Sequence, residues 1–218
     1  DRVVFVALDT DRPSSAAFLE RYKMSFWPTF FLLEPEKGDV LAYLGGAASV
    51  REMRAFIEDG LRVMDAKAPP GDPLLLLSQA AAARAAGDHK KELALYEELL
   101  AKIPKDWSRR DEALAGKLSA LASTGDVEGC ARFGAEHVDE IRGAALPADF
   151  ASVALTCAGK LAKSATQEQT RRKVITRLEA IIASPPPEST VDDRADALAI
   201  LASAKLDLGD ADGARAAH

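Results

Sequence analysis

Residues 21–33 have the sequence RYKMSFWPTFFLL, and this stretch decides the fold of the amino-terminal part of the chain. Thr29 to Leu33 is a continuous apolar run, which is typical of a strand that is covered on both faces. Pro28 stands directly before the run, and proline is tolerated where a loop ends and an edge strand begins. The stretch therefore predicts a buried strand that is entered through a proline.

The residues on both sides of this stretch extend it into an α/β pattern. An apolar, β-branched run comes first, an amphipathic segment opened by Pro13 follows, and a short turn after Leu33 predicts a hairpin. Ser49 and Glu52 form a capping box before a further amphipathic segment. The expected elements are a strand at 3–8, a helix at 14–23, strands at 29–33 and 40–44, and a helix from 50 to 64.

This order of elements resembles the carboxyl-terminal half of a thioredoxin domain, over roughly residues 1–64. The segment VVFVALDTD is similar to the family's strand that ends in acidic residues, and RYKMSFWPTFFLL is similar to its proline-containing segment. The resemblance implies that Pro28 is cis and that Trp27, Pro28 and Thr29 shape a substrate groove. In that groove the backbone of Trp27 is offered to an extended partner chain. From the residues alone, the alternative for Pro28 is that it only ends a loop before an edge strand, and Trp27 could equally be a core aromatic.

The redox site of that family is a Cys-x-x-Cys pair at the start of a helix, where the helix end lowers the pKa of the first thiol. No Cys-x-x-Cys occurs in this chain. The resemblance places the catalytic cysteines, with the amino-terminal strand and helix that carry them, upstream of residue 1. In the family fold that strand lies between the strands expected at 3–8 and 29–33. Without it each buried, unpaired backbone group costs about 1–3 kcal/mol.

The second part of the chain has a helical repeat pattern. A Gly-Asp pair recurs at residues 87, 125 and 209, with a degenerate copy at Ser164-Ala165, which indicates a unit of about 40 residues. In each unit glycine ends one helix and aspartate caps the next. Proline and glycine between the two parts indicate a linker. The domains are therefore expected at 1–66 and 74–218, with a linker at 67–73 and about four helical hairpins in the second domain.

The best copy of the unit, AAGDHKKELALYEELLAKIP at 85–104, resembles the second half of a tetratricopeptide repeat. Glu92 stands where that family has a small residue, and leucines and alanines replace the signature of its first helix. The resemblance implies a concave groove for an extended peptide or a partner protein. The alternative is that the helices only pack against the first domain as a stabilising extension.

Composition excludes several functions. The net charge of -6 leaves no basic stripe for nucleic acid, and the apolar runs are too short for a transmembrane helix. Cys130 and Cys157 form either one bridge or two buried thiols, and no residue spacing suits a metal or a cofactor. Cys130 and His137 share a helix face as packing residues. A periplasmic or secreted location is favoured over a cytoplasmic one.

The remaining polar candidates are expected to be solvated. Asp9 and Asp11 follow the first strand in a turn, His89 lies in a hairpin turn, and the basic clusters at 109–110 and 171–173 are expected on a wet face. We therefore predict a thiol-disulfide oxidoreductase whose cysteine pair lies upstream and whose repeats bind a protein or peptide partner. The alternative is a redox-inactive protein-interaction module with the same folds, in which case the protein is not an enzyme.

Overall fold

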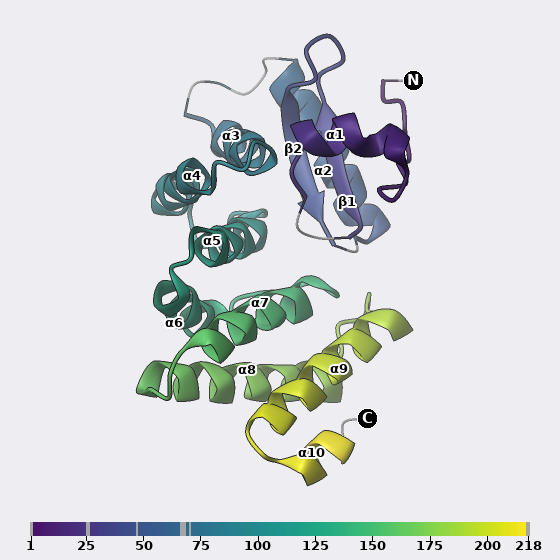
Figure 1. The fold of residues 1–218 in the computed structure, drawn as a ribbon. Helices are drawn as coiled ribbons and strands as arrows, with labels where there is room; N and C mark the ends of the chain where they lie inside the picture. The colour runs from purple at the N-terminus through teal and green to yellow at the C-terminus, as the bar shows by residue number, and fades with distance from the viewer. Residues whose placement is uncertain (1, 25–26, 47, 66–68, 70, 217–218) are drawn as a thin grey trace.

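The computed structural model describes residues 2–24, 27–46, 48–65, 69 and 71–216. Over these ranges the protein is mostly helical, with a small sheet near the amino terminus and a curved array of helices after it (Figure 1). The elements are η1 (Pro13–Ser15), α1 (Ala16–Arg21), β1 (Thr29–Leu33), β2 (Val40–Gly45), α2 (Val50–Met64), α3 (Pro73–Ala85), α4 (His89–Lys102), α5 (Arg110–Thr124), α6 (Val127–His137), α7 (Leu146–Lys160), α8 (Ala165–Ala183), α9 (Val191–Asp207) and α10 (Ala211–Ala216).

Strands β1 and β2 form the antiparallel hairpin that the sequence predicts, with Phe31 opposite Tyr43. The sheet lies between α1 and α2 (Figure 1). On the α1 side, the ring of Phe31 is 5.5 Å from the ring of Tyr22. On the α2 side, Leu32 approaches Gly60 so closely that a Cβ on this glycine would be 2.3 Å from a leucine methyl group. Glycine at position 60 therefore allows the helix to lie directly on the strand.

The prediction of a buried strand at residues 3–8 is wrong. These residues form no strand, and Val4, Phe5 and Val6 are 86%, 77% and 75% exposed. Val3 packs on the cluster between the sheet and α2, and Arg2 forms an ion pair with Asp65. A strand needs a neighbour to satisfy its backbone groups, and no described segment pairs with residues 3–8. Composition favours a strand here, but the pairing partner is missing from the described residues.

The start and end signals of the helices are confirmed. Ser49 and Glu52 form the predicted capping box of α2, and Thr190 and Asp193 form one at α9. Residues 67, 68 and 70 of the expected linker, and residue 66 before it, lie outside the described residues. Asp72 and Pro73, which close the predicted linker, already belong to the start of α3: the Asp72 side chain accepts a hydrogen bond from the backbone N–H of Leu74.

The Gly-Asp pairs shape the helical hairpins as expected. Gly87, Gly125 and Gly209 have positive φ values of 74°, 82° and 79°, a conformation that residues with a Cβ rarely adopt. The following aspartates, Asp88, Asp126 and Asp210, each accept a hydrogen bond from the backbone N–H three residues further on. Ser164 caps α8 in the degenerate copy. His218, expected at the end of the last helix, lies outside the described residues.

The sheet occupies the inner side of the helical curve at α3. Strand β2 packs against α3, and the Ser78 hydroxyl donates a hydrogen bond to the Val40 carbonyl at 3.4 Å. The backbone N–H of Lys23 donates to the Ala85 carbonyl at 2.8 Å. At this end of the array the concave side is thus filled by the sheet, which agrees with the alternative of a packed extension. Open space remains further along, beside α5 and α7.

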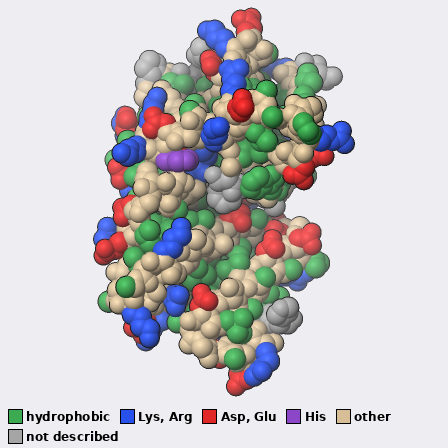
Figure 2. All heavy atoms as spheres, in the orientation of Figure 1, with side chains coloured by type: hydrophobic (Ala, Val, Ile, Leu, Met, Phe, Trp, Pro, Cys, Tyr) green, Lys and Arg blue, Asp and Glu red, His purple; other side chains and the backbone are tan. Residues whose placement is uncertain are grey.

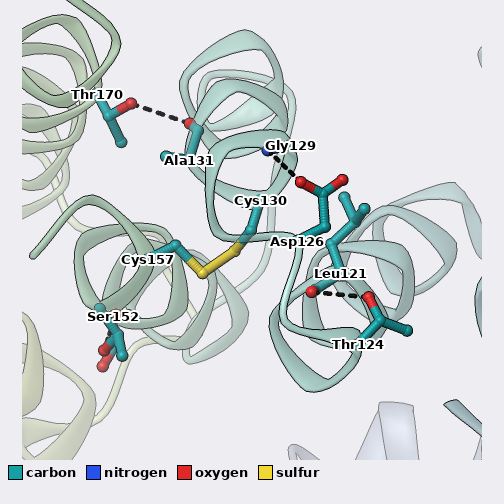
Figure 3. Close-up of a disulfide and its surroundings, with 10 residues drawn as sticks. Leu121, Thr124, Asp126, Gly129, Cys130, Ala131, Ser152, Cys157 and Thr170 are labelled. Carbon is teal, nitrogen blue, oxygen red and sulfur yellow. Dashed lines mark hydrogen bonds between the residues drawn. A yellow bond between two sulfur atoms is a disulfide. The ribbon is translucent and has the colours of Figure 1, made fainter. Parts of the chain in front are cut away.

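A disulfide joins Cys130 of α6 to Cys157 of α7, with a Cα–Cα distance of 6.0 Å (Figure 3). Of the two alternatives that the sequence leaves open, the bridge is therefore the one observed. Both cysteines are buried. Beside the bridge, the hydroxyl of the buried Thr170 on α8 donates a hydrogen bond to the Ala131 carbonyl at 2.9 Å. The bridge and this hydrogen bond join the three helices in the middle of the array.

Candidate functional site

The turn before β1 is the first part of the candidate site. The Trp27–Pro28 peptide bond is cis, as the resemblance implies. The Pro28 carbonyl accepts a hydrogen bond from the backbone N–H of Gly46 at 2.9 Å, which extends the β1–β2 ladder by one pair. Trp27 is 67% exposed, so its interpretation as a core aromatic is wrong. Thr29 is the first residue of β1. A substrate groove at these three residues stays a prediction.

The outer edge of β1 is the second part. In an antiparallel ladder alternate residues direct their backbone groups toward the partner strand, and the residues between them direct theirs outward. The hydrogen bond between Gly46 and Pro28 fixes this alternation, so the backbone groups of Phe31 point to the outer edge. In the described part of the chain β1 pairs with β2 alone. An edge of this kind is a template for a further extended chain.

The same turn lies against the helical array through Gly46. This glycine has a φ of 90°, and a Cβ on it would be 2.8 Å from a carboxylate oxygen of Asp149. Asp149 belongs to the first turn of α7. The sequence analysis missed Asp149, because an aspartate in a first helical turn is ordinary and its neighbour Gly46 is far away in the sequence. The structure thus places Asp149 next to the segment that carries Pro28.

A cavity opens beside Asp149, between the end of β2 and the helices. It encloses about 660 Å³ of empty space, part of it open to solvent. The sheet contributes the last residues of β2, and α7 contributes its first two turns. The surface of the cavity is largely apolar. The residues around it are Tyr43, Leu44, Gly45, Arg84, Tyr96, Glu112, Ala115, Gly116, Leu118, Ser119, Leu146, Asp149, Phe150 and Val153.

The mouth of the cavity is acidic. Burial raises the pKa of Asp149 to about 6, and the nearby charges of Asp196 and Asp193 on α9 act in the same direction. Among the described residues no Lys or Arg forms an ion pair with any of these three carboxylates. Figure 2 shows acidic side chains over the amino-terminal end of α9, where the surface is hollowed between this helix and the sheet. Asp149 at the cavity therefore lies close to two further carboxylates on α9.

The inner wall carries a buried ion pair. The Arg84 guanidinium is 2.5 Å from a carboxylate oxygen of Glu92, and their side chains are 6% and 0% exposed. Arg84 also donates a hydrogen bond to the Ser119 hydroxyl at 3.1 Å and lies 5.0 Å from the centre of the Tyr43 ring. Burial also raises the pKa of Tyr96 in this wall. Glu92 is thus a buried carboxylate that is paired with Arg84.

Some of the polar residues that are expected on the solvent-exposed surface form ion pairs or hydrogen bonds instead. Arg109 forms ion pairs with Asp59 of α2 and Glu112 of α5, and its side chain is 14% exposed. This prediction failed because the sheet layer packs on the helices and covers the residue. His89 is hydrogen-bonded to the buried Glu92 at 2.9 Å. Arg171 forms an ion pair with Asp207. Arg172 pairs with Glu168 on the same helix, but its side chain is 74% exposed, as expected.

Asp9 and His137 form hydrogen bonds with residues two or three positions away in the sequence. The Asp9 side chain accepts hydrogen bonds from the backbone N–H of Asp11 and the guanidinium of Arg12, in an exposed turn as predicted. His137 is hydrogen-bonded to Glu140 at 2.7 Å. In the ranges that the structure describes, no group of three or more His, Cys, Asp or Glu side chains is arranged to hold a metal ion. The helices described there are too short or too polar to cross a membrane.

Comparison with known proteins adds no family. No family model matches the chain, and neither the curated proteins nor the solved structures contain a match. The candidate site therefore rests on its own geometry: an exposed tryptophan before a strand that pairs with β2 alone among the described residues, near a largely apolar cavity that Asp149 helps to line. This geometry is suited to binding a polypeptide.

Proposed function

We propose that the chain binds an extended polypeptide beside Trp27 and Pro28, as the substrate-binding part of a thioredoxin-family thiol-disulfide oxidoreductase. The observation that carries this proposal is the exposed Trp27 directly before β1, a strand that pairs with β2 alone in the described part of the chain. The apolar run at 3–8 is also without a strand neighbour in the described residues. One additional strand would hydrogen-bond to both segments. In the proposed oxidoreductase the upstream redox strand takes this edge, and Trp27 and Pro28 are left to contact the substrate chain.

The proposed chemistry divides the work between two parts of the protein. An upstream cysteine thiolate attacks one sulfur of the substrate disulfide, forms a mixed disulfide and releases the other substrate sulfur as a thiolate. The second upstream cysteine then attacks the mixed disulfide, which frees the substrate and leaves the enzyme oxidised. Trp27 and Pro28 align the substrate chain through backbone contacts. The helical array adds surface for the partner.

A redox-inactive interaction module is the second candidate, and one observation favours it. The chain has two cysteines, and both are buried in the disulfide between α6 and α7. Residues 1–218 therefore offer no thiolate for exchange. In this candidate the strand edge and Trp27 bind a partner chain without any chemistry.

The deciding experiment starts from the natural coding sequence upstream of residue 1. If it encodes a Cys-x-x-Cys, the protein with its natural upstream residues is assayed for reduction of a protein disulfide. The oxidoreductase proposal expects activity that is lost when both upstream cysteines are changed to Ser. It also expects Trp27→Ala to lower kcat/KM at least fivefold. Leu206→Ala, at a residue that is 59% exposed at the far end of α9, is the matched control.

The outcomes separate the candidates. Activity that survives the cysteine changes, or a Trp27→Ala variant with unchanged kcat/KM, contradicts the oxidoreductase proposal. If no Cys-x-x-Cys is encoded, the interaction module is the remaining candidate. Its test is capture of a denatured, extended protein by the chain, with loss of capture in Trp27→Ala.

A further inference from the structure

The cavity between β2 and α7 differs from an ordinary packing defect because it combines an apolar interior with polar and charged side chains. Its inner surface is apolar, with Leu118, Phe150 and Val153 among the lining side chains. On its wall the buried Tyr43 hydroxyl has no partner of hydrogen-bonding geometry within the described residues. Asp149 is one of the lining residues, no described Lys or Arg forms an ion pair with it, and the charges of Asp193 and Asp196 on α9 lie near enough to act on it.

The occupant that fits this combination carries an apolar group next to a positive charge. Burying apolar surface in the cavity is favourable by about 25 cal/mol per Å². A cation beside Asp149 meets a carboxylate that has no ion-pair partner among the described Lys and Arg side chains. The nearby charges of Asp193 and Asp196 add to the attraction. The ion pair between Arg51 and Glu188, at 3.7 Å, involves none of these carboxylates.

The position of the mouth identifies the source of this occupant. Asp149 lies against Gly46, and Gly46 is hydrogen-bonded to Pro28. A polypeptide held at Trp27 and Pro28 would therefore lie near Asp149. A successive pair of side chains, one apolar and one basic, can then reach the cavity and its acidic mouth.

We infer that the cavity is a specificity pocket for a polypeptide that carries a large apolar residue next to Lys or Arg. The apolar side chain enters the space lined by Phe150 and Val153, and the basic group pairs with Asp149. This inference rests on the proposed function, because it takes the polypeptide at Trp27 and Pro28 as given. It adds the sequence class that the partner must have.

The test is a binding titration with three fluorescent peptides that share a Gly/Ser background. Each contains a central Phe, followed by Arg in the first peptide, Gln in the second and Glu in the third. We expect the Phe-Arg peptide to bind at least tenfold more tightly than the Phe-Gln peptide, and the Phe-Glu peptide to bind more weakly than both. Equal affinity for the three peptides overturns the inference, and so does a lack of binding by Phe-Arg.

Two variants locate the site. Asp149→Asn is expected to lower the affinity for the Phe-Arg peptide at least fivefold and to change the affinity for the Phe-Gln peptide by less than twofold. Asp139→Asn, at an exposed aspartate that does not line the cavity, is the matched control and should change neither peptide. Val153→Trp fills the cavity and should weaken both peptides, provided that circular dichroism shows an unchanged helix content. If it does not fold, Val153→Phe replaces it.

The result also separates this inference from the proposed function. One result is that Trp27→Ala lowers the affinity for the Phe-Arg peptide while Asp149→Asn and the variant at Val153 do not. In that case the polypeptide site stands and the specificity pocket is refuted. If the two cavity variants weaken the peptide and Trp27→Ala does not, the pocket binds a polypeptide, but the path past Trp27 is refuted.

Discussion

Removing one partner of the buried Arg84–Glu92 pair should destabilise the protein more than any change to a surface ion pair. In Glu92→Leu the Arg84 guanidinium keeps only neutral acceptors, the Ser119 hydroxyl at 3.1 Å and the Gly116 carbonyl at 3.4 Å. Because its side chain is 6% exposed, water cannot replace the lost carboxylate. Breaking such a pair costs about 3–5 kcal/mol, which is a large part of the roughly 5–15 kcal/mol that stabilises an ordinary domain.

The measurement is urea unfolding followed by circular dichroism, under oxidising conditions so that the disulfide stays intact. The double variant Arg84→Met/Glu92→Leu replaces both charges with apolar side chains of similar size. Such replacements are often neutral or stabilising, so it should recover most of the stability that the single variant loses. Glu98→Gln is the control, because Glu98 pairs with Lys102 on the exposed face and the change should cost about 1 kcal/mol or less.

Two results would refute this reasoning. In the first, Glu92→Leu unfolds within about 1 kcal/mol of the parent protein, which would mean that the guanidinium finds water or another acceptor. In the second, the double variant loses as much as the sum of the two single changes, which would mean that the charges do not interact.

Three further predictions concern the disulfide, the cavity mouth and close helix packing. The double variant Cys130→Ser/Cys157→Ser should lose about 3.5 kcal/mol in urea unfolding, because the bridge spans a sequence separation of 27; a loss below 1 kcal/mol contradicts it. Folding raises the pKa of Asp149 from 3.8 to about 6. The ionised carboxylate therefore destabilises the folded protein to its full extent above pH 6, and this cost is absent below pH 4. At pH 7.5 the free energy of unfolding of Asp149→Asn should thus be about 1 kcal/mol higher than that of the parent, because solvent screening reduces the nominal 3 kcal/mol of this pKa shift. At pH 3.5 the two proteins should be equally stable. Gly116→Ala should cost about 1–3 kcal/mol in the same assay, because its Cβ would lie 2.1 Å from a tyrosine ring carbon, whereas Gly159→Ala, with no atom within 4 Å, should not destabilise.

Local signals in the sequence were sufficient where the structure depends on neighbouring residues. The capping box of Ser49 and Glu52 and the glycine at 125 act over a few residues, and the structure confirms both. The β1–β2 hairpin is equally local. Residues 3–8 show the limit of this reasoning, because their composition favours a strand but a strand also needs a neighbour to pair with.

The candidate site could be predicted only in part, because most of it depends on contacts between distant segments. The resemblance led to Trp27 and Pro28, which lie in one short motif. Asp149 meets Gly46 only after the helical array has folded back onto the sheet. Arg109 was expected in water and is instead paired with Asp59 across the same contact. Neither residue has an unusual sequence neighbourhood, so no pattern in the sequence indicates its role.

The covalent link between α6 and α7 divides the array into parts that should respond differently to mechanical force. Repeat arrays can unravel one unit at a time, because each unit touches only its neighbours. Loss of α8, α9 and α10 from the carboxyl end would remove the carboxylates of Asp193 and Asp196. Unravelling from that end should then stop at the bridge, which clamps α7 to α6. Asp149 and the apolar wall of α7 would stay beside the sheet, so tension on the carboxyl terminus should weaken the acidic mouth before it empties the pocket.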